Sequence, residues 1–154
     1  MSPAAQRVEV ALRKAGVAFG MCSFETPVPT AAAAAAALGC DLGAIANSLV
    51  FKADGRPLLV VASGSHRVDV GLLSQRLGAQ RIRTASPAFV AAKTGQVVGG
   101  VAPVGHIEPI ETVLDLALAS YSLVWAGGGD EHTMVSLSFQ ALSSATGGLA
   151  MEVA

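Results

Sequence analysis

The sequence predicts a mixed α/β fold of the α+β kind, in which a mixed β-sheet is flanked by helices. Helical and extended segments are interleaved along the chain, which is typical of a sheet covered by helices. A hairpin is also indicated, because Asp54-Gly55 lies between two β-rich runs and Asp-Gly is a strong turn signal. With 154 residues, no break in composition and no internal repeat, residues 1–154 are expected to form a single domain.

The predicted helices are marked at both ends by cap and stop residues. Ser2 with Pro3, Thr30, Asp69, Ser86 with Pro87, and Ser138 can each begin a helix, and a glycine follows each helical run. The five helices are predicted at about 3–15, 31–39, 70–77, 88–94 and 139–146.

The predicted strands are short runs rich in β-branched and aromatic residues. They cover 17–24, 45–52, 57–63, 81–83, 107–113, 120–126 and 133–137. Leu58 to Ala62 is apolar on both faces, which indicates a central strand covered on both sides.

Composition narrows the function classes. Hydrophobic residues make up 52% of the chain and charged residues 14%, so a substantial core can form. No signal peptide or membrane-spanning run is visible, so a cytoplasmic protein is expected. Cys22 and Cys40 lack metal-site spacing and are predicted to be buried free thiols.

Charge is distributed unevenly along the chain. All ten Lys and Arg residues lie at or before Lys93, so the first 93 residues carry a formal +5 and the rest a formal −6. A basic face built from the first part could meet a polyanion, although a solvated surface explains most of these residues equally simply.

Familiar catalytic signatures are absent. The sequence has no nucleophile elbow, phosphate loop, zinc-protease helix or dinucleotide-binding glycine motif. His106-x-Glu108 and Asp130-Glu131-His132 could each offer a metal two ligands, but neither spacing is a recognised one. No metal and no other cofactor is predicted.

A glycine-rich run at residues 95–106, G-Q-V-V-G-G-V-A-P-V-G-H, can bring bare backbone against a ligand. A tight turn between strands is the alternative interpretation of such a run. Five pieces occur along the chain in this order and with these spacings: residues 45–51, 62–69, 77–79, 94–95 and 99–106, the last of which lies within the glycine-rich run.

In these five pieces the sequence resembles the YbaK/prolyl-tRNA-synthetase-associated domain family of free-standing aminoacyl-tRNA editing proteins, over nearly the whole chain. The resemblance implies a partly barrel-like mixed sheet and hydrolysis in trans of the ester on a mischarged tRNA. It also implies a substrate-assisted reaction in which the ribose hydroxyl of the terminal adenosine takes part. The family's G-x-x-x-P loop, which borders the aminoacyl pocket, falls on Gly99, Gly100, Val101, Ala102 and Pro103.

One position departs from the family. Members commonly carry a substrate-contacting lysine where this chain has Asn47, which can orient a water or a carbonyl but cannot neutralise a phosphate. Asn47 is nevertheless a predicted catalytic residue together with the five loop residues. A solvent-facing strand residue is the alternative.

The remaining site predictions concern the substrate. Thr30, Ser63, Gly64, His106 and His132 are candidates for binding the substrate, and Arg67, Arg81 and Arg83 for binding the tRNA acceptor end. The two histidines could line the pocket or polarise a water, and structural histidines with satisfied hydrogen bonds are the equally simple alternative. Small residues in the pocket would suit a small amino acid such as alanine or cysteine on tRNA(Pro).

Three functions are therefore considered. The first is an aminoacyl-tRNA deacylase whose partner is mischarged tRNA, with prolyl-tRNA synthetase as a further candidate partner and with no membrane or DNA expected. The second is a catalytically weakened tRNA or aminoacyl-nucleotide binding module of the same fold. The third is a metal-dependent hydrolase using His106, Glu108 and His132.

Overall fold

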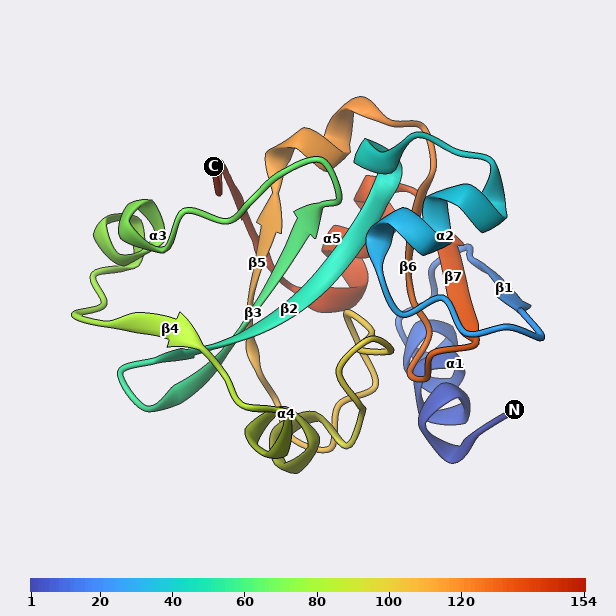
Figure 1. Cartoon of the computed structure of the whole chain (residues 1–154), viewed down its shortest axis with the longest axis horizontal. Helices are drawn as coiled ribbons and strands as arrows, with labels where there is room; N and C mark the ends of the chain where they lie inside the picture. Colours follow the sequence, from blue (N-terminus) through green and yellow to red (C-terminus); the bar gives the residue numbers. More distant parts are fainter.

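The computed structural model describes residues 1–154, and its sheet and five α-helices confirm the predicted mixed class (Figure 1). The helices are α1 (Pro3–Lys14), α2 (Ala31–Leu38), α3 (Val70–Leu77), α4 (Pro87–Thr94) and α5 (Phe139–Thr146). Every predicted cap side chain accepts a hydrogen bond from a backbone N–H of the first turn, as Asp69 Oδ1 does from Leu72 at 3.0 Å. No helix has both the length and the apolar character needed to cross a membrane.

The strands form one eight-stranded mixed sheet. They are β1 (Gly20–Ser23), β2 (Ile45–Ala53), β3 (Arg56–Ser63), β4 (Ile82–Thr84), β5 (Glu111–Asp115), β6 (Val124–Gly127), β7 (Thr133–Leu137) and β8 (Leu149–Met151). The order is β1-β7-β6-β2-β3-β5-β8, with β4 paired to β2, and the pairs β2–β6, β3–β5 and β5–β8 are parallel. Because β1 and β8 do not pair, the sheet is not a closed barrel.

Several predicted boundaries were wrong. The strand expected from 107 begins only at Glu111, after Pro109, which has no N–H to give to a sheet. The strand expected from 120 begins at Val124, because residues Leu116–Ser120 form the short 3-10 helix η2 capped by Asp115. The three-residue strand β8 was not predicted.

The two cysteines are free thiols, but Cys22 and Cys40 are only half-buried rather than buried as predicted. Burial raises the pKa of both thiols.

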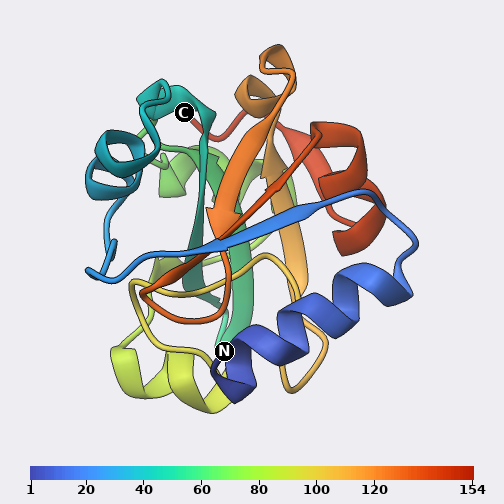
Figure 2. The ribbon, with the colours of Figure 1, turned by 90° about the vertical axis from the view of Figure 1, so that its right-hand side faces the viewer.

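The predicted central strand is confirmed in β3. Leu59 and Val61 face the largest core cluster, which also takes residues from α1 and α5, and these helices cover the sheet on that side (Figure 2). Leu58, Val60 and Ala62 face a second cluster with Leu73 of α3. All five β3 residues are at most 1% exposed.

The sheet is interrupted beside β2, and this interruption positions the site. Along β2, the pairing with β6 covers only Ile45 and Ala46, and the pairing with β4 covers only residues 51–53, so residues 47–50 have no strand on that side (Figure 1). The Val50 carbonyl accepts from Ala85 N–H on the β4 side, at 3.4 Å. Backbone groups of alternate residues point to the same side, so the N–H and carbonyl of Ser48 face the gap.

Candidate active site

A cavity of about 780 Å³ lies at the interrupted edge of β2. Its walls come from α2 and the turn before it, from β2, from the segment between β3 and α3, from the end of β4, and from the glycine-rich loop. A volume of this size is typical of small-molecule sites, which range from roughly 300 to 1,000 Å³.

Both faces of β2 contribute to the cavity. Val50 belongs to the core cluster shared with the glycine loop, so Ser48, two residues earlier, projects to that side. Asn47 projects to the opposite side, opposite Ala62 of β3, and also lines the cavity. Ser48 Oγ is buried and has no hydrogen-bond partner.

The glycine-rich loop is shaped by the buried amide of Gln96. Its Oε1 accepts from Ala102 N–H at 2.8 Å, and its Nε2 donates to the carbonyls of Val104 (3.1 Å) and Gly105 (3.4 Å). Gln96 is 1% exposed, so the bonds that hold the loop are themselves shielded from water.

Glycine is required at two positions of the loop for different structural reasons. Gly99 has a φ of +95°, which side-chain-bearing residues rarely adopt. A Cβ on Gly100 would come within 2.5 Å of the Asp130 backbone, so only glycine lets the loop lie against the turn after β6.

The five loop residues predicted from the motif divide into two groups. Gly99 and Val101 line the cavity, and their N–H groups donate to no atom of the chain. Gly100 N–H bonds to the Val97 carbonyl at 2.9 Å, and Ala102 N–H bonds to Gln96. Pro103 lies in a separate hollow of about 370 Å³.

The predicted substrate-binding residues are also divided. Thr30 lines the main cavity, although its hydroxyl caps α2. Ser63 is 1% exposed, and its hydroxyl donates to the Gly43 carbonyl at 2.7 Å, so it lies behind the wall. Gly64 is also outside the lining, packed against Ala31 of α2.

Neither predicted histidine reaches the main cavity. His106 lies in the smaller hollow, with Nε2 2.7 Å from the Ala102 carbonyl, and burial lowers its pKa. His132 Nδ1 lies 3.0 Å from the Phe24 carbonyl at an exposed position.

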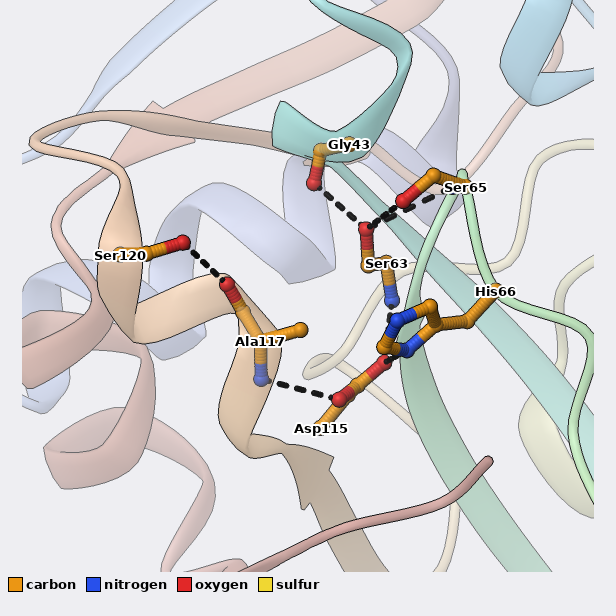
Figure 3. A network of polar contacts seen from close by, with 7 residues as sticks. All are labelled: Gly43, Ser63, Ser65, His66, Asp115, Ala117 and Ser120. Carbon is orange, nitrogen blue, oxygen red and sulfur yellow. Dashed lines mark hydrogen bonds and ion pairs between the residues drawn. The ribbon is translucent and has the colours of Figure 1, made fainter.

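A third histidine, which the sequence analysis did not select, lines the cavity. His66 Nδ1 is 2.7 Å from Oδ2 of Asp115, whose side chain is 1% exposed (Figure 3). Oδ2 also accepts from Ser63 N–H, and Oδ1 from Ala117 N–H, both at 3.0 Å. The available sequence signal was the position of His66 just after the central covered strand.

Five cationic side chains lie in the cavity lining or at the end of β2 and β3 that carries the hairpin. Arg67 lines the cavity, whereas Arg81 and Arg83 lie outside its lining, in and just before β4. Arg83 is opposite Lys52 across the β2–β4 pair, and Arg56 begins β3 at the same end. None of these five cations lies within 4 Å of a carboxylate. Lys52 Nζ lies over the Phe89 ring, 5.1 Å from its centroid, so the four arginines are the ones left to meet a polyanion.

The residues considered for a metal are otherwise occupied. Glu108 pairs with Lys93 at 3.6 Å, and Asp130 accepts from Ser2 Oγ and from the His132 N–H. No group of three or more potential ligands is brought together, so the structure gives the metal-dependent hypothesis no site.

Comparison with known proteins defines the class. The sequence matches the aminoacyl-tRNA editing domain family over residues 25–144, and the chain belongs to this family.

Particular relatives narrow the comparison. The chain is 34% identical over 121 residues to the uncharacterised protein YwhH of Bacillus subtilis, covering 78% of this chain and 76% of that protein. It is 37% identical over 100 residues to a proline--tRNA ligase of Bacillus licheniformis, covering 65% of this chain but 18% of the ligase. A crystal structure of a candidate trans-editing enzyme for prolyl tRNA synthetase superposes with a TM-score of 0.92 at 34% identity, covering 99% and 98% of the two chains. The predicted family and fold are thus confirmed.

Proposed function

We propose that this chain hydrolyses, in trans, the ester that joins a small amino acid to a mischarged tRNA. The observation that carries the proposal is the cavity at the open edge of β2, in a member of the aminoacyl-tRNA editing domain family. The similarity to part of a proline--tRNA ligase makes tRNA(Pro) carrying alanine or cysteine the first substrate to test.

Backbone donors supply the electrostatic part of the mechanism. Ester hydrolysis places negative charge on the carbonyl oxygen, and preorganised N–H groups stabilise it without a charged side chain. Gly99 and Val101 have such groups free at the cavity. Loss of one oxyanion donor typically lowers the rate on the order of 100-fold to 1000-fold.

Side-chain size supports a small substrate. Ala31, Ala34 and Ala46 lie in the wall with Gly99 and Val101, leaving room for the terminal adenosine and a short side chain. Steric exclusion of larger aminoacyl groups is how editing sites select. Asn47 lines the cavity, and its amide would orient the ester carbonyl or the ribose hydroxyl that assists the reaction.

The free cations supply the contact with tRNA. Arg67 at the cavity would meet the terminal phosphates, and Arg81 and Arg83 the acceptor stem further along. Such contacts release counterions, so the apparent KM should rise with salt.

The test is a deacylation panel. Purified protein is incubated with tRNA(Pro) carrying alanine, cysteine or proline, and release of labelled amino acid is followed against a protein-free control. Faster loss of alanine or cysteine than of proline supports the proposal. No acceleration with any mischarged tRNA would remove it.

A second candidate function is a binding module without turnover, and the neutral Asn47 at the cavity favours it. Saturable binding of a non-hydrolysable aminoacyl-adenosine, with no deacylation, would identify this case. The Asn47→Lys variant then separates the two functions, because gain of activity would show that only the cation is lacking.

A further inference from the structure

His66 is the one residue of the cavity lining whose side chain has a ring nitrogen that can accept a proton. The lining contains two ionisable side chains, His66 and Arg67, and arginine stays protonated in proteins. Histidine as a class changes its charge between about pH 5 and 8. The His66 side chain is 36% exposed, so it is open to a ligand and to water.

The hydrogen bonds of Asp115 determine which ring nitrogen is free. Backbone N–H groups only donate, so both Asp115 oxygens act as acceptors, for Ser63 N–H and Ala117 N–H. The Nδ1 proton of His66 is therefore assigned to the bond with Oδ2, and Nε2 keeps its lone pair. Nε2 makes no hydrogen bond within the chain.

The surroundings hold this arrangement in place. Ser63 ends β3 and Asp115 ends β5, two parallel strands whose carboxyl ends meet at one edge of the sheet, where ligands of such sheets are commonly bound. Ser63 Oγ lies 3.0 Å from Ser65 Oγ and is tied to η1 (Leu42–Ala44) through Gly43 (Figure 3). The charged groups beside His66 are Asp115 from β5 and Arg67 from its own segment.

We propose that His66 is the general base of the deacylation, held in its tautomer by Asp115. The inference rests on the proposed function, in which the ribose hydroxyl assists the reaction, and adds a side chain that takes the proton from the attacking water. Nε2 takes a proton from water as the water oxygen bonds to the ester carbonyl carbon. The C–O bond to the ribose then breaks, and the imidazolium returns the proton to the ribose oxygen, giving the free amino acid and a tRNA with its hydroxyl restored.

The decisive variant is His66→Gln, whose amide can still donate to Asp115 but cannot act as a base. The readout is the single-turnover rate constant between about pH 5 and 8, corrected for spontaneous hydrolysis. The wild-type constant should fall on acidification as the imidazole is protonated. The variant should be slower by on the order of 100-fold and should lose that pH-dependent limb, with little change in KM.

Controls separate this inference from the proposed function. Gln75→Ala changes an exposed residue of α3 outside the cavity and should leave both the rate and the pH profile unchanged. If the wild type deacylates and His66→Gln keeps its rate within about twofold with the same pH profile, the role of His66 is refuted and the deacylase function stands. If the wild type cleaves no mischarged tRNA, the proposed function itself fails.

A measurement on the wild type covers the case in which the variant does not fold. Two-bond proton–nitrogen spectra of labelled protein report the tautomer of each histidine. The proposal expects His66 to carry its proton on Nδ1, and a proton on Nε2 in the neutral ring would overturn it.

Discussion

Two segments border the same cavity, and each is held by one buried polar side chain of different charge. The glycine loop is organised by Gln96, and the segment after β3 by Asp115, both 1% exposed. Gln96 both donates and accepts, and its partners are all backbone groups. Asp115 only accepts, and one of its partners is the imidazole of His66.

This difference teaches what each anchor is suited to do. A neutral amide can fix the path of a backbone that carries both donors and acceptors, leaving other N–H groups free for a ligand. A carboxylate forms stronger, charge-assisted bonds and can also fix the tautomer of a histidine. The loop is therefore built to present backbone dipoles, and the β3 segment to present an ionisable group.

The largest expected effect is on removal of the charged anchor. Asp115→Ala leaves the Ser63 and Ala117 N–H groups without their acceptor and frees His66. Hydrogen bonds to charged groups are worth more than neutral ones, so we expect a loss of about 4 kcal/mol in the free energy of unfolding, measured in urea. Asp69→Ala, which removes an exposed helix cap, is the matched control and should cost about 1 kcal/mol.

Removal of the neutral anchor should cost less. Gln96→Ala leaves the buried Ala102 N–H unpaired and takes a donor from the Val104 carbonyl, for an expected loss of about 3 kcal/mol. Gln75→Ala at an exposed position of α3 should be nearly neutral. A larger loss for Gln96→Ala than for Asp115→Ala would reverse the proposed ranking of the two anchors.

His106, at the end of the glycine loop, extends the comparison to the pH dependence of stability. Burial lowers the pKa of His106, with the bond to the Ala102 carbonyl acting in the opposite direction. In the unfolded chain the pKa of histidine is about 6.5, so as the pH falls below this value the unfolded chain takes up a proton before the folded protein does. The free energy of unfolding therefore decreases until the pH has passed the lower pKa of the folded state. His106→Gln should remove this loss, which is at most about 1.4 kcal/mol per pH unit, in urea titrations at pH 7 and pH 5. An unchanged pH dependence in the variant would contradict it.

Local signals predicted the fold well because each depends on a few adjacent residues. The helix caps, the hairpin at Asp54-Gly55 and the covered strand β3 all follow from short patterns that the structure confirms. Strand β8 was missed because its three residues are stabilised by pairing with β5 rather than by their own pattern. Such pairing has no local signature.

The site was less accessible to sequence reasoning because it depends on distant contacts. The cavity exists because β4 and β6 stop short on the same side of β2, which no local pattern specifies. His66 meets a carboxylate 49 residues away, and Asp115 lies beyond the strand predicted at 107–113, so no local pattern selected it. The motif located the glycine loop, but which of its N–H groups are free depends on Gln96.

The smallest expected effect tests the region between the two segments, on β2. Ser48 Oγ is buried without a partner, so the hydroxyl carries a desolvation cost that no hydrogen bond offsets. Ser48→Ala should therefore stabilise the unliganded protein by about 1 kcal/mol in urea unfolding, against the usual destabilising direction of core substitutions. If Ser48→Ala instead destabilises the protein by a similar amount, the hydroxyl has a partner in solution and the gap beside β2 is narrower than described.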